Sequence, residues 1–398
     1  MSDYDYAWYA KHSFTPLINV SGTMTGLGAS IITQSAIAEA TAEAMQHFVS
    51  MHEAQARASE LIAQLTQAEA GCLTASASAG ISLSVAGCMT GLNPGKVEAL
   101  PAADGMKNEV IVQAGHLCGY GAPIAQAITL AGAEVKSVGQ STSCCDYQIS
   151  SAISENTVAA LYVVSHHVVH YGQCPLSRFV ELCHARDIPV IVDAASEYDL
   201  TGFLAAGADI VIYSGHKFLG GPTAGIIAGR KDLVKAAYLQ NLGIGRGMKI
   251  GKESIMGAMA AMQAWLQRDH KAVLQHEYQC LELWQNALAD APGIRASIVP
   301  DPTGNPLYRL QVDIDSDTTG WTAAQAVTAL AADEPKIIVR DHEIEHGYFQ
   351  LDPCNLQPGQ EKEVSQRLVK TLKSDAPSRH PAADARNGSV NGYLSWLT

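Results

Sequence analysis

Aromatic residues are scarce in this chain of 398 residues: they make up 6% of the sequence, although 47% of it is hydrophobic. Small aliphatic side chains must therefore form most of the core. Basic residues are also few, with 26 Lys and Arg against 39 Asp and Glu, so the net charge is −13. Because a negative surface repels phosphate backbones, we expect no nucleic-acid partner.

Long apolar segments are missing as well. No apolar run reaches the ~18 residues that a membrane span requires, so we expect no membrane contact. The acidic start, Met1–Tyr6, lacks the apolar stretch of a signal peptide. The 9 cysteines form no Cys-x-x-Cys motif, which favours reduced thiols and a cytoplasmic location. The adjacent Cys144 and Cys145 are interpreted as inert thiols, with redox activity as the alternative.

The middle of the sequence alternates between short β-branched runs and helical segments from residue 109 to residue 229. Uninterrupted apolar strands that alternate with helices are typical of an α/β fold with a mostly parallel sheet covered on both faces. Two further helices are predicted before this region, over residues 33–49 and 51–70. The predicted strands are 109–113, 134–138, 159–165, 189–192, 209–213 and 225–228.

The pattern changes after Gly251, where apolar residues recur at helical spacing and the strands lie farther apart. This part is typical of a smaller α+β domain. The predicted division of the chain is an N-terminal arm (1–49), a large cofactor-binding domain (50–245), a small domain (246–373) and a mobile tail (374–398).

A lysine follows one of the buried strands at once, because Ile210–Ser214 leads directly into Gly215, His216 and Lys217. A lysine at the carboxyl edge of a parallel sheet is well placed to meet a ligand. When desolvated, such a lysine has a lowered pKa and can form a Schiff base. A solvated loop lysine is the alternative.

The strand before it ends in Asp193, and the small residue Ala195 follows. In enzymes that use pyridoxal 5′-phosphate (PLP), a carboxylate of this kind pairs with the ring nitrogen and keeps it protonated, so that the ring accepts carbanion electrons. Ala195 is small enough to lie flat against such a ring. The alternatives are a helix N-cap for Asp193 and plain packing for Ala195.

A run of tiny residues, Thr74–Gly80, precedes an apolar helix and offers backbone amides for a phosphate at the helix start. Ser76, Ala77 and Ser78 are the candidate phosphate ligands there, and Ser214 adds a hydroxyl. Tight helix packing is the alternative. A dinucleotide site is disfavoured, because no Gly-x-Gly pair in the sequence is completed by a third glycine.

Six motifs extend this pattern along the chain: Ile18–Thr25, Gly115-His116, Val164–His167, Val192–Ala195, Ser214–Lys217 and Gly245–Glu253. Together they resemble the fold type I PLP enzymes. The resemblance is to one group in particular, which contains selenocysteine synthase (L-seryl-tRNA selenium transferase) and D-glucosaminate-6-phosphate ammonia-lyase. It spans about residues 18–372.

The resemblance implies a role for each strand end. Lys217 would hold the cofactor through a Schiff base and shuttle the α-proton, Asp193 would pair with the pyridine nitrogen, and His116 would stack on the ring. His166 and His167 would approach the ring oxygen or the substrate. The alternatives are a satisfied loop histidine for His116 and a metal site at the other histidines, which we disfavour because no carboxylate or cysteine completes a ligand set.

Substrate contacts are implied as well. Arg340 closes a strand of the small domain, where this fold places an arginine on the substrate carboxylate; a surface ion pair is the alternative. Thr23, in the first motif, is a second candidate. Arg246 forms a basic cluster with Lys249 and Lys252, which would meet an anionic substrate group or a cofactor phosphate across a dimer interface, or would otherwise be a solvated helix start.

The implied function is abstraction of the α-proton of a small amino acid through an external aldimine, followed by elimination as in ammonia-lyases. Racemisation or epimerisation and β-replacement share its first half and stay open, as does a non-catalytic binding protein of the same fold. The chain lacks the extra N-terminal domain expected of the tRNA-dependent transferase, although Lys217–Gly225 is closer to that enzyme than to the sugar-acid lyase. We expect a homodimer or a multiple of one.

Overall fold

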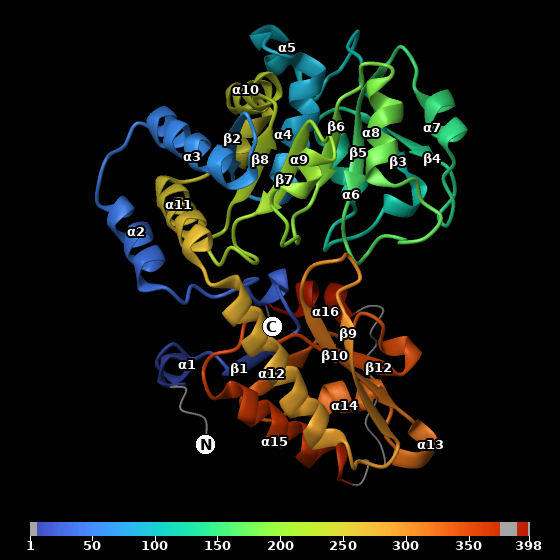
Figure 1. The fold of residues 1–398 in the computed structure, drawn as a ribbon. Helices are drawn as coiled ribbons and strands as arrows, with labels where there is room; N and C mark the ends of the chain where they lie inside the picture. Colours follow the sequence, from blue (N-terminus) through green and yellow to red (C-terminus); the bar gives the residue numbers. More distant parts are fainter. Residues whose placement is uncertain (1–5, 375–387, 397–398) are drawn as a thin grey trace. The chain divides into compact units, whose positions relative to one another are not determined.

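The computed structural model describes residues 6–374 and 388–396 (Figure 1). The chain forms two compact units: Ser30–Arg268, and Met1–Ala29 combined with Asp269–Thr398. The division expected at residue 245 differs from these units, because helix α11 (Lys252–Gln267) packs against α2 (Ser35–Met45) and α3 (Met51–Thr66) in the larger unit. Of the tail predicted as mobile, residues 375–387 and 397–398 lie outside the described residues, and helix α16 occupies Gly388–Ser395.

A seven-stranded sheet forms the centre of the larger unit (Figure 1). Five neighbouring strands run parallel, and β8 runs antiparallel between β7 and β2. The prediction of a mostly parallel sheet is therefore confirmed. In spatial order the strands are β2 (Ala70–Thr74), β8 (Gly225–Gly229), β7 (Ile210–Ser214), β6 (Val190–Asp193), β5 (Thr157–Val163), β3 (Glu109–Gln113) and β4 (Glu134–Val138).

Helices cover both faces of this sheet, as its continuous apolar strands require. Ile111 of β3 joins the core on one face, while its neighbours Val110 and Val112 join the core on the other. The first face carries α3, α8 (Leu176–His184) and α11, and the second carries α4 (Ala77–Thr90), α6 (Ile124–Thr129) and α10 (Lys231–Leu239).

Strand β2 lies at the edge of the sheet, and side chains of α3 pair with its free backbone groups. The Gln55 amide donates to the Leu73 carbonyl at 2.8 Å and accepts from the Leu73 N–H at 2.8 Å. The Ser59 hydroxyl accepts from the Gly71 N–H at 3.0 Å. Because buried backbone groups need partners, these bonds fix the edge strand and the loop that follows it.

Two predicted helices are shorter than expected. The helix expected over 51–70 was wrong at its end: it stops at Thr66, because Gln67 takes a left-handed φ of 61°. The helix expected over 33–49 is confined to α2, and the chain links it to α3 through Ser50, whose hydroxyl accepts from the Glu53 N–H at 3.4 Å.

The carboxyl ends of six strands decide where chemistry is possible. Strand β2 is antiparallel to β8, which is itself antiparallel to β7, so β2 ends at the same edge as β3 to β7. The residues at or just after these ends include Ser76, His116, His166, Asp193 and Lys217. The topology thus brings predicted site residues from five separate segments to one edge of one sheet.

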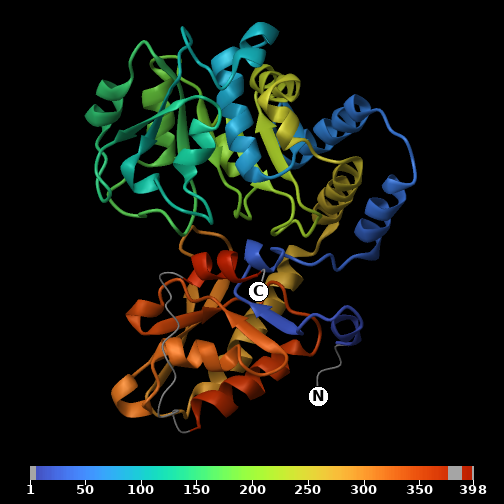
Figure 2. The same ribbon diagram turned by 180° about the vertical axis from the view of Figure 1, so that it is seen from behind.

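The smaller unit is an α+β structure with two small sheets (Figure 2). One sheet pairs an N-terminal strand in parallel with a strand of the C-terminal half, and the other is antiparallel. Trp284 and Phe349 are fully buried between these strands and three helices. The elements are β1 (Leu17–Val20) with β11 (Lys336–Val339), then β12 (Tyr348–Leu351), β10 (Tyr308–Ile314) and β9 (Ile294–Pro300), and α12 (His270–Leu288), α14 (Ala323–Leu330) and α15 (Gln360–Leu372).

The remaining elements are short. Among the residues that the structure describes, none of the helices combines the length and the apolar character that crossing a bilayer demands. The short helices and 3-10 turns (η) are α1 (Ala7–Lys11), η1 (Thr25–Leu27), α5 (Pro94–Ala99), η2 (Ala114–His116), α7 (Asp146–Ala152), α9 (Gly202–Ala205), η3 (Gln240–Leu242), η4 (Ile244–Met248), α13 (Ser316–Thr319) and η5 (Ile344–His346).

Candidate active site

Lys217 sits in a tight turn after β7 that is fixed by hydrogen bonds from several segments. The Ser30 hydroxyl donates to the carbonyls of His216 at 2.8 Å and Lys217 at 2.9 Å. The Gly220 N–H donates to the Lys217 carbonyl at 3.0 Å, and the Gly221 N–H donates to the Gly215 carbonyl at 2.9 Å. Because the backbone is held on both sides, the lysine side chain leaves the sheet edge from a fixed point.

The amine of Lys217 lies in a partly buried, mainly acidic environment. Burial lowers the pKa of Lys217, and the carboxylates of Asp193 and Glu197 oppose that shift. The Nζ atom donates a hydrogen bond to the Ser196 hydroxyl. A lowered lysine pKa increases the fraction of neutral amine near pH 7, and the neutral amine is the form that forms a Schiff base or accepts a proton.

Asp193 ends β6, next to β7, and is 7% exposed. Its Oδ1 accepts from the Ala195 N–H at 3.2 Å, and no bond to its other oxygen is present among the residues that the structure describes. Burial raises the pKa of Asp193 to about 6, and Lys217 opposes the shift. At pH 7 the group is therefore ionised, with one oxygen available to a protonated ring nitrogen. This arrangement fits PLP.

The start of α4 offers a binding site for the phosphate group of PLP. The Ser76 hydroxyl caps the helix by accepting from the Ala79 N–H at 3.1 Å, and the amides of Ala77 and Ser78 have no bond within the described part of the chain. The Ser78 hydroxyl lies 2.8 Å from the Tyr120 hydroxyl. Two free amides at the N-terminus of a 14-residue helix suit an anion.

Ser214 comes close to this helix start through β8. Gly225 of β8 is in register with both Ser214 and Thr74, and a Cβ at Gly225 would lie only 2.1 Å from the Ser76 carbonyl oxygen. The Ser214 hydroxyl is buried, 3.3 Å from Nδ1 of His216. Only a glycine at position 225 lets the loop before α4 pack on the sheet.

His116 lies in η2, directly after β3, and is 2% exposed. Its Nδ1 accepts from the Val163 N–H at 3.2 Å, so the ring carries its proton on Nε2 when neutral. Burial, with a smaller contribution from His170, lowers the pKa of His116 to about 4. The ring stands edge-on to Tyr162, with centroids 4.5 Å apart and planes at 87°. It is therefore a neutral, fixed imidazole at the sheet edge.

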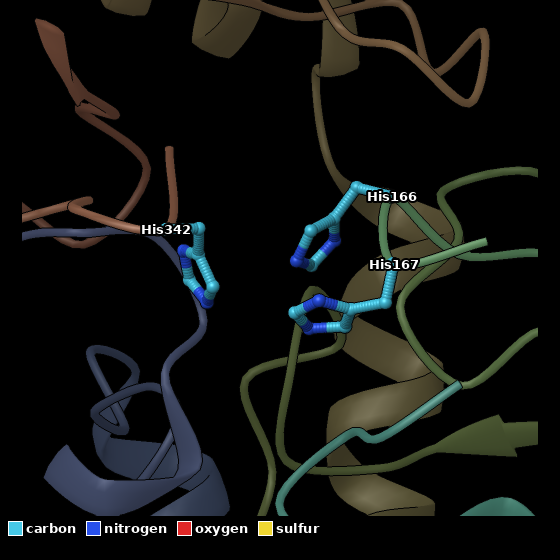
Figure 3. Close-up of side chains that lie close together, drawn as sticks. All are labelled: His166, His167 and His342. Carbon is cyan, nitrogen blue, oxygen red and sulfur yellow. The ribbon is translucent and has the colours of Figure 1, made fainter. Parts of the chain in front are cut away.

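His166 and His167 follow β5 and lie beside each other (Figure 3). Their ring centroids are 3.7 Å apart, and the planes meet at 47°. The structure thus brings both histidines to the carboxyl edge that also carries Asp193 and Lys217, as the sequence predicted for that strand end. Their contact with ring or substrate stays a prediction.

Arg340 belongs to the smaller unit, where it is 6% exposed and its backbone pairs with Gln350. Within the described residues its guanidinium makes no hydrogen bond or ion pair. The nearby Arg309 is neutralised by Asp301 at 2.6 Å and Asp352 at 3.2 Å. Burial, and then Arg309, lower the pKa of Arg340. Asp352, Glu343 and Asp301 oppose that shift. Because none of them forms a direct ion pair with Arg340 among the described residues, the buried guanidinium can still bind an anion such as a carboxylate.

Thr23 lies in the same unit, after β1. The carbonyl oxygen of its neighbour Gly22 accepts a hydrogen bond from the Asn355 side-chain amide at 2.9 Å, and a Cβ at Gly22 would lie 3.0 Å from Asp352 Oδ2. Since Asp352 also binds Arg309, the Thr23 loop and the Arg340 strand approach the same carboxylate.

The basic cluster is divided by the structure. Arg246 and Lys249 are exposed in or next to η4, beside the start of α4, because the Met248 carbonyl accepts from the Ala75 N–H at 3.1 Å and the Thr74 hydroxyl at 2.9 Å. Lys252 instead donates to the His47 carbonyl and lies 5.6 Å from the ring centroid of Phe48. Arg246 therefore remains the candidate for an anionic group.

Sequence analysis missed several residues at this edge. Ser196 accepts a hydrogen bond from the lysine amine. Burial raises the pKa values of Cys118 and Tyr120, and the charge of Asp193 contributes less to the same shift. Tyr120 is thus hydrogen-bonded to Ser78 at the start of α4 and lies within the electrostatic influence of Asp193. In the sequence, the position of Ser196 three residues after Asp193 was its one indication of a site role. Nothing in the sequence indicated a site role for Cys118 and Tyr120, which lie in an irregular loop.

Comparisons with known proteins agree with this geometry. The family model of L-seryl-tRNA selenium transferase matches residues 17–289. D-glucosaminate-6-phosphate ammonia lyase of Salmonella typhimurium is 36% identical over 360 residues, which cover 90% of this chain and 96% of the relative. The 5′-C-glycyluridine monooxygenase-decarboxylase of Streptomyces sp is 33% identical over 380 residues, which cover 95% of each protein.

A solved structure of D-glucosaminate-6-phosphate ammonia-lyase has a TM-score of 0.83 and 36% identity, and the match covers 93% of this chain and 99% of that chain. These similarities confirm the predicted group, the fold type I architecture, PLP as the cofactor and an enzymatic function of the lyase type. The roles of individual site residues stay predictions.

Proposed function

Because the chain belongs to the L-seryl-tRNA selenium transferase family, we propose that it eliminates a β-substituent and ammonia from a small 2-amino acid. The observation that carries this proposal is the pair of Lys217 and Asp193 on neighbouring strand ends. Burial lowers the pKa of the lysine and raises the pKa of the aspartate to about 6, yet each opposes the shift of the other. A base and a ring-nitrogen partner are thus available together at neutral pH.

Four groups of the larger unit would hold the cofactor. Lys217 would attach to it, Asp193 would bond the ring nitrogen, His116 would contact the ring with its neutral face, and Ser76 to Ser78 would bind the phosphate through the start of α4. When bound, PLP supplies a conjugated ring that accepts the electron pair left when a bond to Cα breaks. Ala195 leaves room for that ring beside Asp193.

The chain's residues then divide the work of the reaction. The neutral amine of Lys217 would take the proton from Cα, and Asp193 in its ionised form would keep the ring nitrogen of the bound cofactor protonated. The bond from Cβ to its oxygen substituent breaks next, and the leaving hydroxide takes the proton that Lys217 gained from Cα and departs as water. Hydrolysis of the resulting unsaturated amine gives a keto acid and ammonia.

Arg340 is our candidate for the substrate carboxylate, with Thr23 as a second contact. The buried guanidinium of Arg340 has no direct ion pair within the described residues, whereas Arg309 beside it has two. A planar guanidinium that binds a carboxylate through two hydrogen bonds fixes the orientation of Cα. His167 and Arg246 are further candidates for polar groups of the substrate.

We infer the substrate class from chemistry that two relatives share. A seryl group and D-glucosaminate are both 2-amino acids with a 3-hydroxyl group, and these are the compounds that the relatives' names contain. A 2-amino-3-hydroxy acid is therefore the substrate class that we propose for this chain. The net charge of −13 argues for a free amino acid rather than one attached to tRNA.

Assembly and location belong to the same proposal. We propose a homodimer or a multiple of one, supported by the fully exposed Phe48 and the exposed Arg246; light scattering that finds a fully active monomer would contradict it. All nine cysteines are free thiols within the described residues, which supports a reducing compartment such as the cytoplasm.

A panel of D- and L-forms of serine and threonine, with D-glucosaminate and its 6-phosphate, tests the proposal in deuterated water. Elimination predicts keto acid and ammonia in equal amounts, and Lys217→Ala should abolish both. Deuterium at Cα together with the opposite configuration, and without keto acid, would replace elimination with racemisation or epimerisation. Carbon dioxide release that requires oxygen would instead favour the chemistry named for the Streptomyces relative.

Absorption spectra separate the cofactor from the reaction. The protein loaded with PLP should show a visible band that is lost in Lys217→Ala. No band in the loaded wild type would overturn the enzyme assignment in favour of a non-catalytic relative. A normal band without turnover of the free amino acids, but with turnover of a seryl-tRNA, would overturn the proposed substrate class alone.

A further inference from the structure

Ser196 occupies a position that the motifs did not assign. It lies in the turn after β6, half-buried, three residues after Asp193. Strand β6 pairs directly with β7, whose end leads into Lys217. The two turns therefore face each other across adjacent strands, and Nζ of Lys217 donates a hydrogen bond to Oγ of Ser196.

The other groups around the Lys217 amine are ionisable. Asp193 and Glu197 favour its charged form. His216, which directly precedes Lys217 in the chain, has its pKa lowered by burial and by Lys217. A carboxylate acceptor would hold the lysine in its charged, unreactive state. A hydroxyl is a neutral acceptor, so it orients the amine with a much smaller bias toward the ammonium form.

A neutral amine has two N–H bonds and one lone pair. When one N–H is committed to Ser196, rotation about the Cε–Nζ bond is restricted, and the lone pair is confined to a narrow range of directions. Proton transfer at Cα depends on that direction, because the base must reach the hydrogen in line and within hydrogen-bond distance.

We propose that Ser196 is a positioning residue that holds the free amine of Lys217 in the orientation for proton transfer. The inference rests on the proposed role of Lys217 as the base. Ser196 acts through the lysine and not on the substrate, so its loss should lower turnover while substrate binding changes little.

Cofactor-free protein gives a readout that does not depend on the reaction. The rate of reductive methylation of Lys217 by formaldehyde and cyanoborohydride, measured by peptide mass spectrometry across pH, reports the neutral fraction of its amine. An acceptor stabilises an ammonium more than an amine. In Ser196→Ala the midpoint should therefore shift to lower pH, by up to about one unit. Ser196→Thr, which keeps the hydroxyl, should retain the wild-type midpoint.

Turnover with the best substrate of the panel completes the test. Ser196→Ala should reduce kcat by about 10-fold to 100-fold with KM changed by less than about threefold, and Ser196→Thr should recover most of the loss. Melting curves identify any variant that does not fold, and Ser196→Cys, close in volume but a weak acceptor, then replaces Ser196→Ala.

The outcomes separate this inference from the proposed function. A midpoint and a kcat unchanged in Ser196→Ala would overturn the role of Ser196, even if elimination is found. A shifted midpoint in a protein whose wild type eliminates nothing would leave the contact intact and overturn the proposed reaction. Loss of kcat that Ser196→Thr does not recover would assign Ser196 a packing role instead.

Discussion

Replacing Gly225 with alanine should weaken cofactor binding strongly, and the structure gives the scale of the effect. Gly225 begins β8 and is in register with both Ser214 and Thr74. A Cβ there would lie 2.1 Å from the Ser76 carbonyl oxygen and 2.8 Å from the Ala77 nitrogen. Both atoms belong to the backbone, so no flexible side chain can move aside.

The displacement follows from these distances. Real Cβ contacts are essentially never shorter than 3.0 Å, so β8 and the start of α4 must separate by about 1 Å. Overpacking of this kind costs roughly 1–3 kcal/mol. If the loop at Ser76 takes up the movement, its amides leave their positions for the phosphate. Since ~1.4 kcal/mol is tenfold in affinity, the Kd for PLP should rise about 10-fold to 100-fold.

The matched control is Gly247→Ala, because a Cβ at Gly247 meets nothing within 4 Å. Fluorescence titration of cofactor-free protein with PLP gives the Kd of each variant, and urea unfolding without PLP gives the stability. Gly247→Ala should bind as the wild type does. The reasoning is refuted if Gly225→Ala binds PLP with the wild-type Kd, or if its loss of affinity is matched by Gly247→Ala.

Three further predictions concern charge. Affinity for PLP should fall as the pH drops below about 6, the value to which burial raises the pKa of Asp193; titrations of Asp193→Asn should lack this step. Because the pKa of Asp193 in the folded protein lies above its ordinary value, Asp193 should make cofactor-free protein lose stability as the pH rises from about 4 to about 6. The urea midpoint of Asp193→Asn should not fall with pH over this range. Arg340→Met should raise the urea midpoint of ligand-free protein by removing a buried charge that has no direct ion pair among the described residues, whereas Arg309→Met should lower it by leaving Asp301 and Asp352 unpaired; the opposite order would show that the nearby carboxylates compensate the charge of Arg340.

The strands of the central sheet could be predicted because each is a short apolar run with turn residues on both sides. Strand β2 could not, since its residues 70–74 are small and follow good helix formers. It is a strand because it borders β8 and because Gln55 satisfies its open backbone edge. Both causes are tertiary, and neither is visible in the local sequence.

The same distinction holds at the candidate site. Asp193 and Lys217 could be predicted, because an ionisable residue at the end of a buried strand is conspicuous wherever that strand lies in the sheet. Ser196 and Tyr120 could not. Ser196 meets the lysine only because β6 and β7 are neighbours, and Tyr120 meets Ser78 through an irregular loop that no periodicity describes.

The division of groups within the chain bears on why relatives with such similar sequences differ in reaction. The groups that would hold PLP and move the α-proton lie on the strand ends of one unit, and they serve a step that elimination, racemisation and replacement have in common. What happens next depends on the bond at Cα or Cβ that is aligned with the ring. That alignment would be set by the groups that bind the carboxylate and the rest of the substrate, for which Arg340 and Thr23 are the candidates that we propose. A substitution at Arg340 should therefore change the distribution of products, and one at Asp193 should slow all of them equally; product ratios that respond to Asp193→Asn but not to Arg340→Lys would contradict this assignment.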